Sequence, residues 1–156
     1  MPSSESSSPG VHVPPPLVYA TGLALGLWMS AWIPSHWLPA AVSRAAGWTL
    51  IAAALVLATP SFYGFFRART TVLPDRPASS LITSGPYRFT RNPLYVSQTL
   101  VYLGVAALYQ CGWALPLLVL VLLYIDRRVI RPEERYLERR FGADYTRYCA
   151  NVRRWI

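Results

Sequence analysis

The sequence of 156 residues contains no lysine, only seven acidic residues and only two cysteines. Charged residues make up 14% of the chain, whereas about a quarter of the residues in a soluble domain are charged. Residues 6–43, 45–66 and 92–125 contain no charge at all. Because a helix needs about 20 apolar residues to cross a bilayer, these uncharged stretches predict an integral membrane protein.

The few cysteines and histidines argue against a disulfide and against a metal site. Cys111 and Cys149 fall at expected opposite ends of the membrane domain, so no bond between them is expected. Neither cysteine has the spacing of a metal site, and His12 and His36 lie in expected loops. We therefore expect no metal.

All the basic residues are arginines, and the net charge is +8. They gather at the ends of apolar segments and form no single basic face, so no nucleic-acid partner is expected. The connection 67–91 and the tail after Ile125 carry all but one of them, whereas the turns 34–43 and 110–113 carry none. The positive-inside rule then places both basic segments and both termini in the cytoplasm.

The expected fold is an all-α integral membrane protein of about four transmembrane helices with a cytosolic C-terminal helical cap. Residues 1–16 are rich in serine and proline, which predicts a disordered tail. They lack the basic start of a signal peptide, so no cleavage is expected. One membrane domain, 17–156, follows. Its spans are expected at about 17–33, 44–66, 93–110 and 113–130, before the cap 131–156.

The fourth span has to include charged residues, because its apolar part, 113–125, is too short to cross a bilayer. Asp126 follows directly, and its short side chain does not reach far toward water. A charge at such a depth is costly unless it has a partner or faces a polar cavity. We therefore expect Asp126 to meet a partner inside the helical bundle.

Residues 85–95, Gly-Pro-Tyr-Arg-Phe-Thr-Arg-Asn-Pro-Leu-Tyr, form a central segment between the polar connection and the third span. Pro86 and Pro93 prevent one continuous helix and leave backbone groups available to a ligand. The arginines of the segment suit an anion, and its aromatic side chains suit a soft cation. An ordinary interfacial turn is the alternative, because arginine and tyrosine often anchor helix ends.

A second polar segment begins after Pro132 with Glu133 and Glu134. Acids in its first turn, arginines in its last turn and Gly142 as a stop predict a short helix. Taken alone, the acid pair is typical of any charged first turn. Both polar segments follow expected cytosolic helix ends, so we expect them to meet on one face of the membrane.

Together with Val-Arg-Arg-Trp at 152–155, these segments resemble the isoprenylcysteine carboxyl methyltransferase family, which is related to phospholipid N-methyltransferases. The resemblance covers roughly residues 79–155, about half of the chain. It implies that S-adenosylmethionine is the methyl donor and binds at the cytosolic membrane surface. Because an apolar bundle carries a polar, arginine-rich cap, we further expect a lipophilic acceptor that reaches the site laterally from the lipid bilayer.

The resemblance assigns cofactor contacts to the matching positions. Residues 79–82 match the stretch that lines the nucleoside, Glu133 matches an acid on the opposite side, and Asn92 replaces the histidine of a His-Pro-x-Tyr motif. Asparagine keeps a donor and an acceptor but does not change charge near neutral pH. The expected cofactor-binding residues are Ser79, Ser80, Leu81, Ile82, Tyr87, Arg91, Asn92, Pro93, Leu94, Tyr95 and Glu133.

The family also places an arginine near the methyl acceptor, where Val129 stands in this chain. Arg128 or Arg131 is expected to serve instead. A carboxylate acceptor needs no general base, whereas an amine acceptor has to lose a proton, for which Glu134 or Asp126 is a candidate. The expected catalytic residues are Arg128, Arg131 and Glu134.

The expected function is S-adenosylmethionine-dependent methyl transfer, like that of protein-S-isoprenylcysteine O-methyltransferases. The alternatives are a phospholipid N-methyltransferase, a sterol-reductase-like enzyme that uses a nicotinamide dinucleotide, a glutathione-using membrane protein and a non-catalytic membrane scaffold. We expect a multi-pass protein of a bacterial inner membrane, with its active site facing the cytoplasm.

Overall fold

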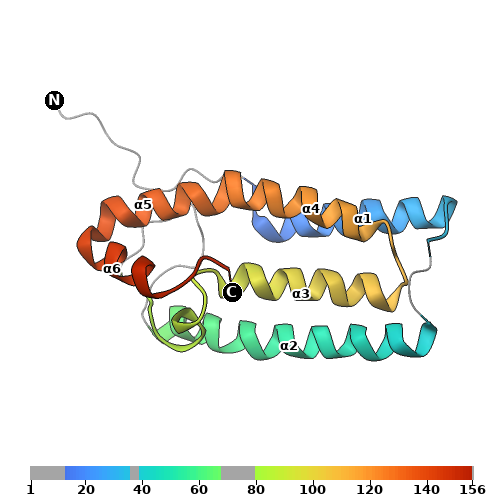
Figure 1. Ribbon diagram of the computed structural model, residues 1–156, viewed down its shortest axis with the longest axis horizontal. Coiled ribbons are helices and arrows are strands. Elements are labelled where there is room, and N and C mark those ends of the chain that lie inside the picture. The colour runs from blue at the N-terminus through green and yellow to red at the C-terminus, as the bar shows by residue number, and fades with distance from the viewer. Residues whose placement is uncertain (1–12, 36–38, 68–79, 156) are drawn as a thin grey trace.

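The computed structural model describes residues 13–35, 39–67 and 80–155, and within these ranges the chain is helical, with one isolated β-bridge. In Figure 1, the helices of the bundle lie side by side and alternate in direction, and α5 continues the line of α4 beyond this bundle. The helices are α1 (Pro15–Trp32), α2 (Ala40–Arg67), the 3-10 helix η1 (Gly85–Arg88), α3 (Pro93–Leu108), α4 (Ala114–Ile125), the π-helix η2 (Asp126–Ile130), α5 (Arg131–Phe141) and α6 (Ala143–Asn151).

Each expected span contains a helix of the bundle, but four membrane crossings are not confirmed. Among the described helices, only α2 is long and apolar enough to cross a membrane by itself, with a mean hydropathy of 1.6 in Ala40–Gly64. At helical rise, α3 is about 24 Å long and α4 about 18 Å, which is shorter than a bilayer core. Helix α1 begins at Pro15, two residues before the expected span, and most of the predicted tail lies outside the described residues.

The fourth span was expected to continue as a helix to residue 130, but its α-helix ends earlier. Helix α4 ends at Ile125, and the π-helix Asp126–Ile130 leads into α5, which has Pro132 in its first turn. A proline removes one helical hydrogen bond and crowds the preceding turn, and the wider π-turn relieves that crowding. Across this turn Val129 and Ile130 are buried, whereas Arg127 and Arg128 are exposed.

Helix α2 packs mainly on α3, and α1 packs mainly on α4. The first pair meets at Gly47 and Gly104, where a Cβ on either glycine would lie 2.9 Å from the carbonyl oxygen of the other. Gly26 of α1 similarly meets Ala114, whose backbone would lie 3.2 Å from an added Cβ. Such small residues allow the backbones of membrane helices to approach closely.

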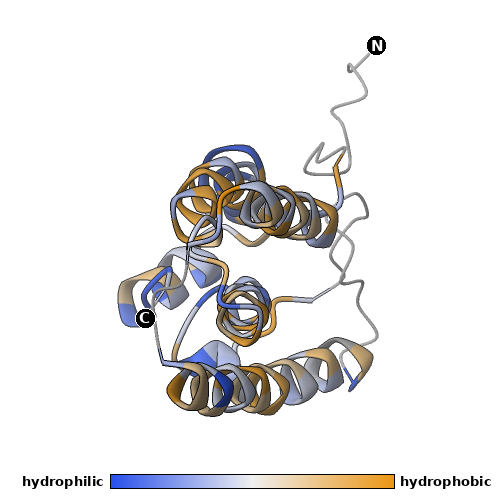
Figure 2. Ribbon diagram, turned by 90° about the vertical axis from the view of Figure 1, so that its right-hand side faces the viewer, coloured by the Kyte–Doolittle hydropathy of each residue, from blue (hydrophilic) through white to orange (hydrophobic). Residues whose placement is uncertain are grey.

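Tyrosines form much of the core between α1, α3 and α4. The Tyr102 hydroxyl donates to the Ala114 carbonyl at 2.9 Å, and the Tyr19 hydroxyl hydrogen-bonds that of Thr99 at 3.0 Å. Figure 2 shows hydrophobic stretches along all four helices of the bundle. Large apolar side chains also cover their outer faces, for example Trp48 at 64% and Val56 at 74% exposed, which is typical of contact with lipid.

Candidate active site

The central segment turns sharply between the end of α2 and the start of α3. It makes one 3-10 turn at Gly85–Arg88, in which Gly85 has a φ of 62°, a left-handed conformation that favours glycine. Tyr87 is buried, whereas Arg88 and Phe89 are exposed. The turn therefore directs one tyrosine toward the protein and leaves an arginine and a phenylalanine outside.

Tyr95 in the first turn of α3 contacts Glu133 in the first turn of α5. The Tyr95 hydroxyl lies 3.0 Å from each carboxylate oxygen of Glu133, so it donates to this carboxylate. Burial raises the pKa of Glu133 to about 7; the hydrogen bond from Tyr95 lowers it, and the neighbouring charge of Glu134 raises it. Burial, Tyr148 and Glu133 together raise the pKa of Tyr87. The central segment and the acid pair thus meet, as expected.

An ion network lies beside this pair and joins five residues. The Glu134 carboxylate lies 2.9 Å from Arg91 Nη1, and it accepts from Arg154 Nε at 3.1 Å and Nη2 at 2.6 Å. Arg154 Nη1 also reaches Asp126 Oδ1 at 3.3 Å, and Arg131 Nε reaches Asp126 Oδ2 at 2.8 Å. Asp126 therefore has partners, and one of them comes from the C-terminal end of the chain.

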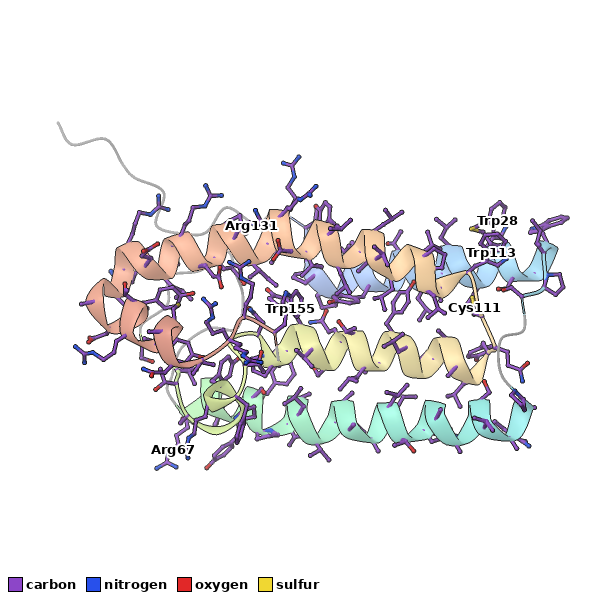
Figure 3. All side chains as sticks on the ribbon, in the orientation of Figure 1. Trp28, Arg67, Cys111, Trp113, Arg131 and Trp155 are labelled. Atoms are coloured by element: carbon purple, nitrogen blue, oxygen red, sulfur yellow. The ribbon has the colours of Figure 1, made fainter. Side chains whose placement is uncertain are left out.

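Residues 152–155, the C-terminal strap, fold back along the central segment. Thr90 and Arg153 form a parallel bridge, and the Arg91 amide donates to the Arg153 carbonyl at 2.9 Å. The Arg154 carbonyl accepts from Asn92 Nδ2 at 2.9 Å and from the Thr90 hydroxyl at 3.2 Å. In Figure 3, Trp155 lies between α3 and the line of α4 and α5, where it packs on the buried core.

The structure brings many of the expected cofactor-binding residues to this end of the bundle. Ser80, Leu81 and Ile82 are half-buried, and Ile82 lies against Gly64 of α2. Ser79 lies outside the described residues. The residues found in the central segment or opposite it are Tyr87, Arg91, Asn92, Pro93, Leu94, Tyr95 and Glu133. Their contact with a cofactor stays a prediction.

The expected catalytic residues are less closely grouped. Arg128 is exposed on η2 and forms no ion pair with any residue of the described ranges. The Arg131 side chain is 54% exposed and bound to Asp126, while Glu134 is held by two arginines. The sequence reasoning missed Arg154, because it treated Val-Arg-Arg-Trp only as a matching motif.

A groove of about 460 Å³ opens beside the ion network and is lined by Arg131, Glu134, Arg135, Glu138 and Arg154. Its lining residues carry charges of both signs, next to the apolar bundle. Within the described part of the chain, no group of three or more histidine, cysteine or acidic residues is placed to hold a metal ion.

The fold and the site define an all-helical protein with a charged site at one end of an apolar bundle. Residues 42–144 match the family model of the phospholipid methyltransferases, so the chain belongs to this family. The family includes isoprenylcysteine carboxyl methyltransferase-like proteins, and its members are membrane proteins. The expected resemblance is therefore confirmed at the level of the family.

One of the curated relatives extends the match over nearly the whole chain. The nickel-cobalt-cadmium resistance protein NccN of Alcaligenes xylosoxydans xylosoxydans is 29% identical over 153 residues, which are 91% of this chain and 70% of NccN. The cobalt-zinc-cadmium resistance protein CzcN of Cupriavidus metallidurans is 38% identical over 77 residues, which are 48% of this chain and 36% of CzcN. The match to CzcN thus spans about a third of that relative. No solved structure matches the chain.

Proposed function

We propose that this chain transfers a methyl group from S-adenosylmethionine to a lipophilic acceptor at the cytosolic face of a membrane. The observation that carries the proposal is the contact between Tyr95 and Glu133. Burial raises the pKa of this carboxyl, and Glu133 forms no ion pair with any of the residues that the structure describes. A half-buried acid without a cation suits a positively charged ligand.

The surrounding groups fit the charges of S-adenosylmethionine, which has an ammonium, a carboxylate and a sulfonium. Bound there, it would supply an electrophilic methyl group. Glu133 would accept from the ammonium or from a ribose hydroxyl, and the rings of Tyr87 and Tyr95 suit the sulfonium at roughly 0.5–2 kcal/mol each. Arg91 suits the carboxylate, because its Nε is buried without a hydrogen-bond partner in the described ranges.

The chain itself would contribute orientation and the exclusion of water. Methyl transfer needs an in-line approach of the acceptor in a dry site, and positioning supplies much of the rate. A carboxylate acceptor requires no base. For an amine acceptor a base has to take up a proton; the expected candidates, Glu134 and Asp126, are both bound by arginines.

A lipophilic acceptor is supported by the apolar surface beside the site. Phe66 at the end of α2 and Phe89 in the central segment are 83% and 79% exposed. Both lie in the segments that border the site, so an acyl or prenyl chain would meet apolar groups as it arrives from the bilayer. Such a surface suits a prenylated cysteine carboxylate as well as a phospholipid amine, and a soluble acceptor would have no need of it.

Calorimetric titration of the purified chain in lipid nanodiscs tests this proposal. We expect S-adenosylmethionine to bind and Glu133→Gln to weaken binding about ten- to a hundredfold, because a charge-assisted hydrogen bond contributes about 1.5–3 kcal/mol. Asp144→Asn is the matched control, since it removes an acidic charge that is 77% exposed on α6. Equal affinity of the native and Glu133→Gln proteins would contradict the proposal, and binding of reduced nicotinamide dinucleotide instead would favour the reductase alternative.

Radiolabelled methyl donor then identifies the acceptor. The native protein is incubated in separate reactions with a prenylcysteine analogue and with phosphatidylethanolamine vesicles, and the label is followed into the lipid fraction. We expect label in one of these acceptors, and its lability to base separates a methyl ester from an N-methyl group. Label in neither acceptor, or only in water-soluble products, would contradict a lipophilic acceptor of these classes.

A further inference from the structure

Arg154 contacts three elements that surround the proposed site. Its backbone carbonyl accepts from Asn92 of the central segment. Its guanidinium reaches Asp126 of η2 and binds Glu134 of α5 through two nitrogens. Its side chain is 34% exposed, and the hydrogen bond to Glu134 raises the pKa of Arg154, so this residue stays charged.

The strap fixes the direction in which this arginine points. The bridge between Thr90 and Arg153 sets the register of the strap against the central segment. Trp155 then packs on the buried core, next to Arg154 in the chain. The side chain of Arg153 is exposed, so of the two consecutive arginines only Arg154 enters the ion network. The inward position is therefore a property of the folded strap.

The two consecutive glutamates consequently have different surroundings. Arg91 and Arg154 hold the carboxylate of Glu134, while the carboxylate of Glu133 faces the Tyr95 hydroxyl. Two neighbouring acids with no cation disfavour each other's ionisation. A cation that binds one of them reduces this repulsion and leaves the other one available to a ligand.

We propose that Arg154 is a positioning residue of the methyltransferase site, which holds Glu134 and Asp126 so that Glu133 alone of the acid pair faces the cofactor. The identity of the cofactor rests on the proposed function, whereas the contacts of Arg154 are observed independently of it. The strap would thus belong to the active site through the contacts of Arg154 with Asn92, Asp126 and Glu134.

Titration of the Glu133 carboxyl in the ligand-free protein tests this role directly. The titratable groups that face Glu133 are Tyr95 of α3, Tyr87 of η1 and Glu134 of α5. The protein is labelled with carbon-13 at glutamate carboxyls, and the Glu133 signal is assigned by its loss in Glu133→Gln. In Arg154→Gln we expect the midpoint of this titration to rise by about one pH unit, because the charge of Glu134 is less compensated.

Cofactor binding should change in a pH-dependent way. A midpoint that rises from about 7 to about 8 reduces the ionised fraction at pH 7 from about a half to about a tenth, so Arg154→Gln should lose about fivefold in affinity there. At pH 8 the loss should be only about twofold. An equal loss at both pH values would mean that Arg154 only stabilises the fold, and would overturn the proposal.

Three further variants keep the test decisive. Arg140→Gln removes an exposed arginine of α5 and should leave the Glu133 midpoint at its native value. The double variant Glu134→Gln with Arg154→Gln removes both charges, so the Glu133 midpoint should return to the native value or fall below it. If the single variant Arg154→Gln does not fold, this double variant tests whether Arg154 acts on Glu133 through the charge of Glu134. Arg154→Lys keeps the charge but loses the contact through two nitrogens, so its Glu133 midpoint should lie between those of the native protein and Arg154→Gln.

Failure of the proposed function would be separate from failure of this inference. If the native protein does not bind S-adenosylmethionine, the proposed function fails, while the carboxyl titration still measures the effect of Arg154 on Glu133. If the midpoint in Arg154→Gln equals that in Arg140→Gln, the positioning role is wrong, whatever the ligand.

Discussion

The two ends of the helical bundle are held together in different ways. At the end that carries Cys111 and Trp113 (Figure 3), hydrogen bonds between uncharged groups join the segments. There the Gly112 amide donates to the Ser35 carbonyl at 3.1 Å, and Trp113 Nε1 donates to the Ile33 carbonyl at 2.9 Å. At the other end the ion network and the strap connect α5 with the central segment.

This difference shows where the fold tolerates partly buried charge. Taking an ion out of water is costly unless a partner compensates it; toward the end of Cys111 and Trp113, Arg44 near the start of α2 is exposed, and none of the described residues there is a buried ion. At the charged end Asp126 and Glu134 have arginine partners, whereas Glu133 has only a tyrosine hydroxyl among its described hydrogen bonds. A cationic ligand would complete the site there.

The largest effect expected on the bundle itself is that of Gly104→Ala. An added Cβ would lie 2.7 Å from Ile51 and 2.9 Å from the Gly47 carbonyl, so α2 and α3 would have to separate. We expect a loss of about 1–3 kcal/mol in the free energy of unfolding, as for other overpacked cores, with unchanged cofactor affinity of the folded fraction. Denaturant unfolding in detergent measures it.

Gly64→Ala is the matched control on α2, away from the close contact with α3. Its Cβ would lie 3.5 Å from Ile82, an ordinary contact, and alanine favours a helix by up to about 1 kcal/mol over glycine. We therefore expect Gly64→Ala to be neutral or stabilising. Equal unfolding midpoints for the two variants would contradict the role given to the close contact at Gly104.

The positions of the helices were predictable from the sequence because uncharged stretches and turns alternate clearly. The meeting of Tyr95 and Glu133 was predictable as well, since both follow helix ends on the arginine-rich side. The π-helix had no local signal, because its five residues also suit an α-helix. The inward position of Arg154 depends on a hydrogen bond that its carbonyl accepts from Thr90, 64 residues earlier, which no local pattern reveals.

Affinity for S-adenosylmethionine should depend on pH through Glu133. The pKa of this carboxyl is raised from 4.5 to about 7, so protonation removes its charge below about pH 7. We expect affinity to fall by up to about tenfold for each pH unit below 7, whereas Glu133→Gln should show little dependence. Calorimetry at pH 6, 7 and 8 measures this, and a flat profile for the native protein would show that Glu133 is not the acid involved.

The stability of the ligand-free protein should change in the opposite direction. A carboxyl whose pKa is higher in the folded state than in the unfolded state binds more protons when folded. The contribution of Glu133 is therefore fully present below about pH 4.5 and is lost as the pH rises through about 7. Glu133→Gln should flatten this part of the stability profile, which thermal unfolding across the same pH range would reveal.

The smallest effect compares one side-chain hydrogen bond at each end of the bundle. Asn92→Ala removes the bond to the Arg154 carbonyl, and Trp113→Phe removes the bond to the Ile33 carbonyl; both bonds are 2.9 Å long. Each change should cost about 0.5–1.5 kcal/mol of unfolding free energy. Only Asn92→Ala should also weaken cofactor binding, because it loosens the strap. Asn92→His keeps a ring donor and should bind the cofactor near the native level. Equal cofactor binding by Asn92→Ala and Trp113→Phe would show that the strap has no influence on the site.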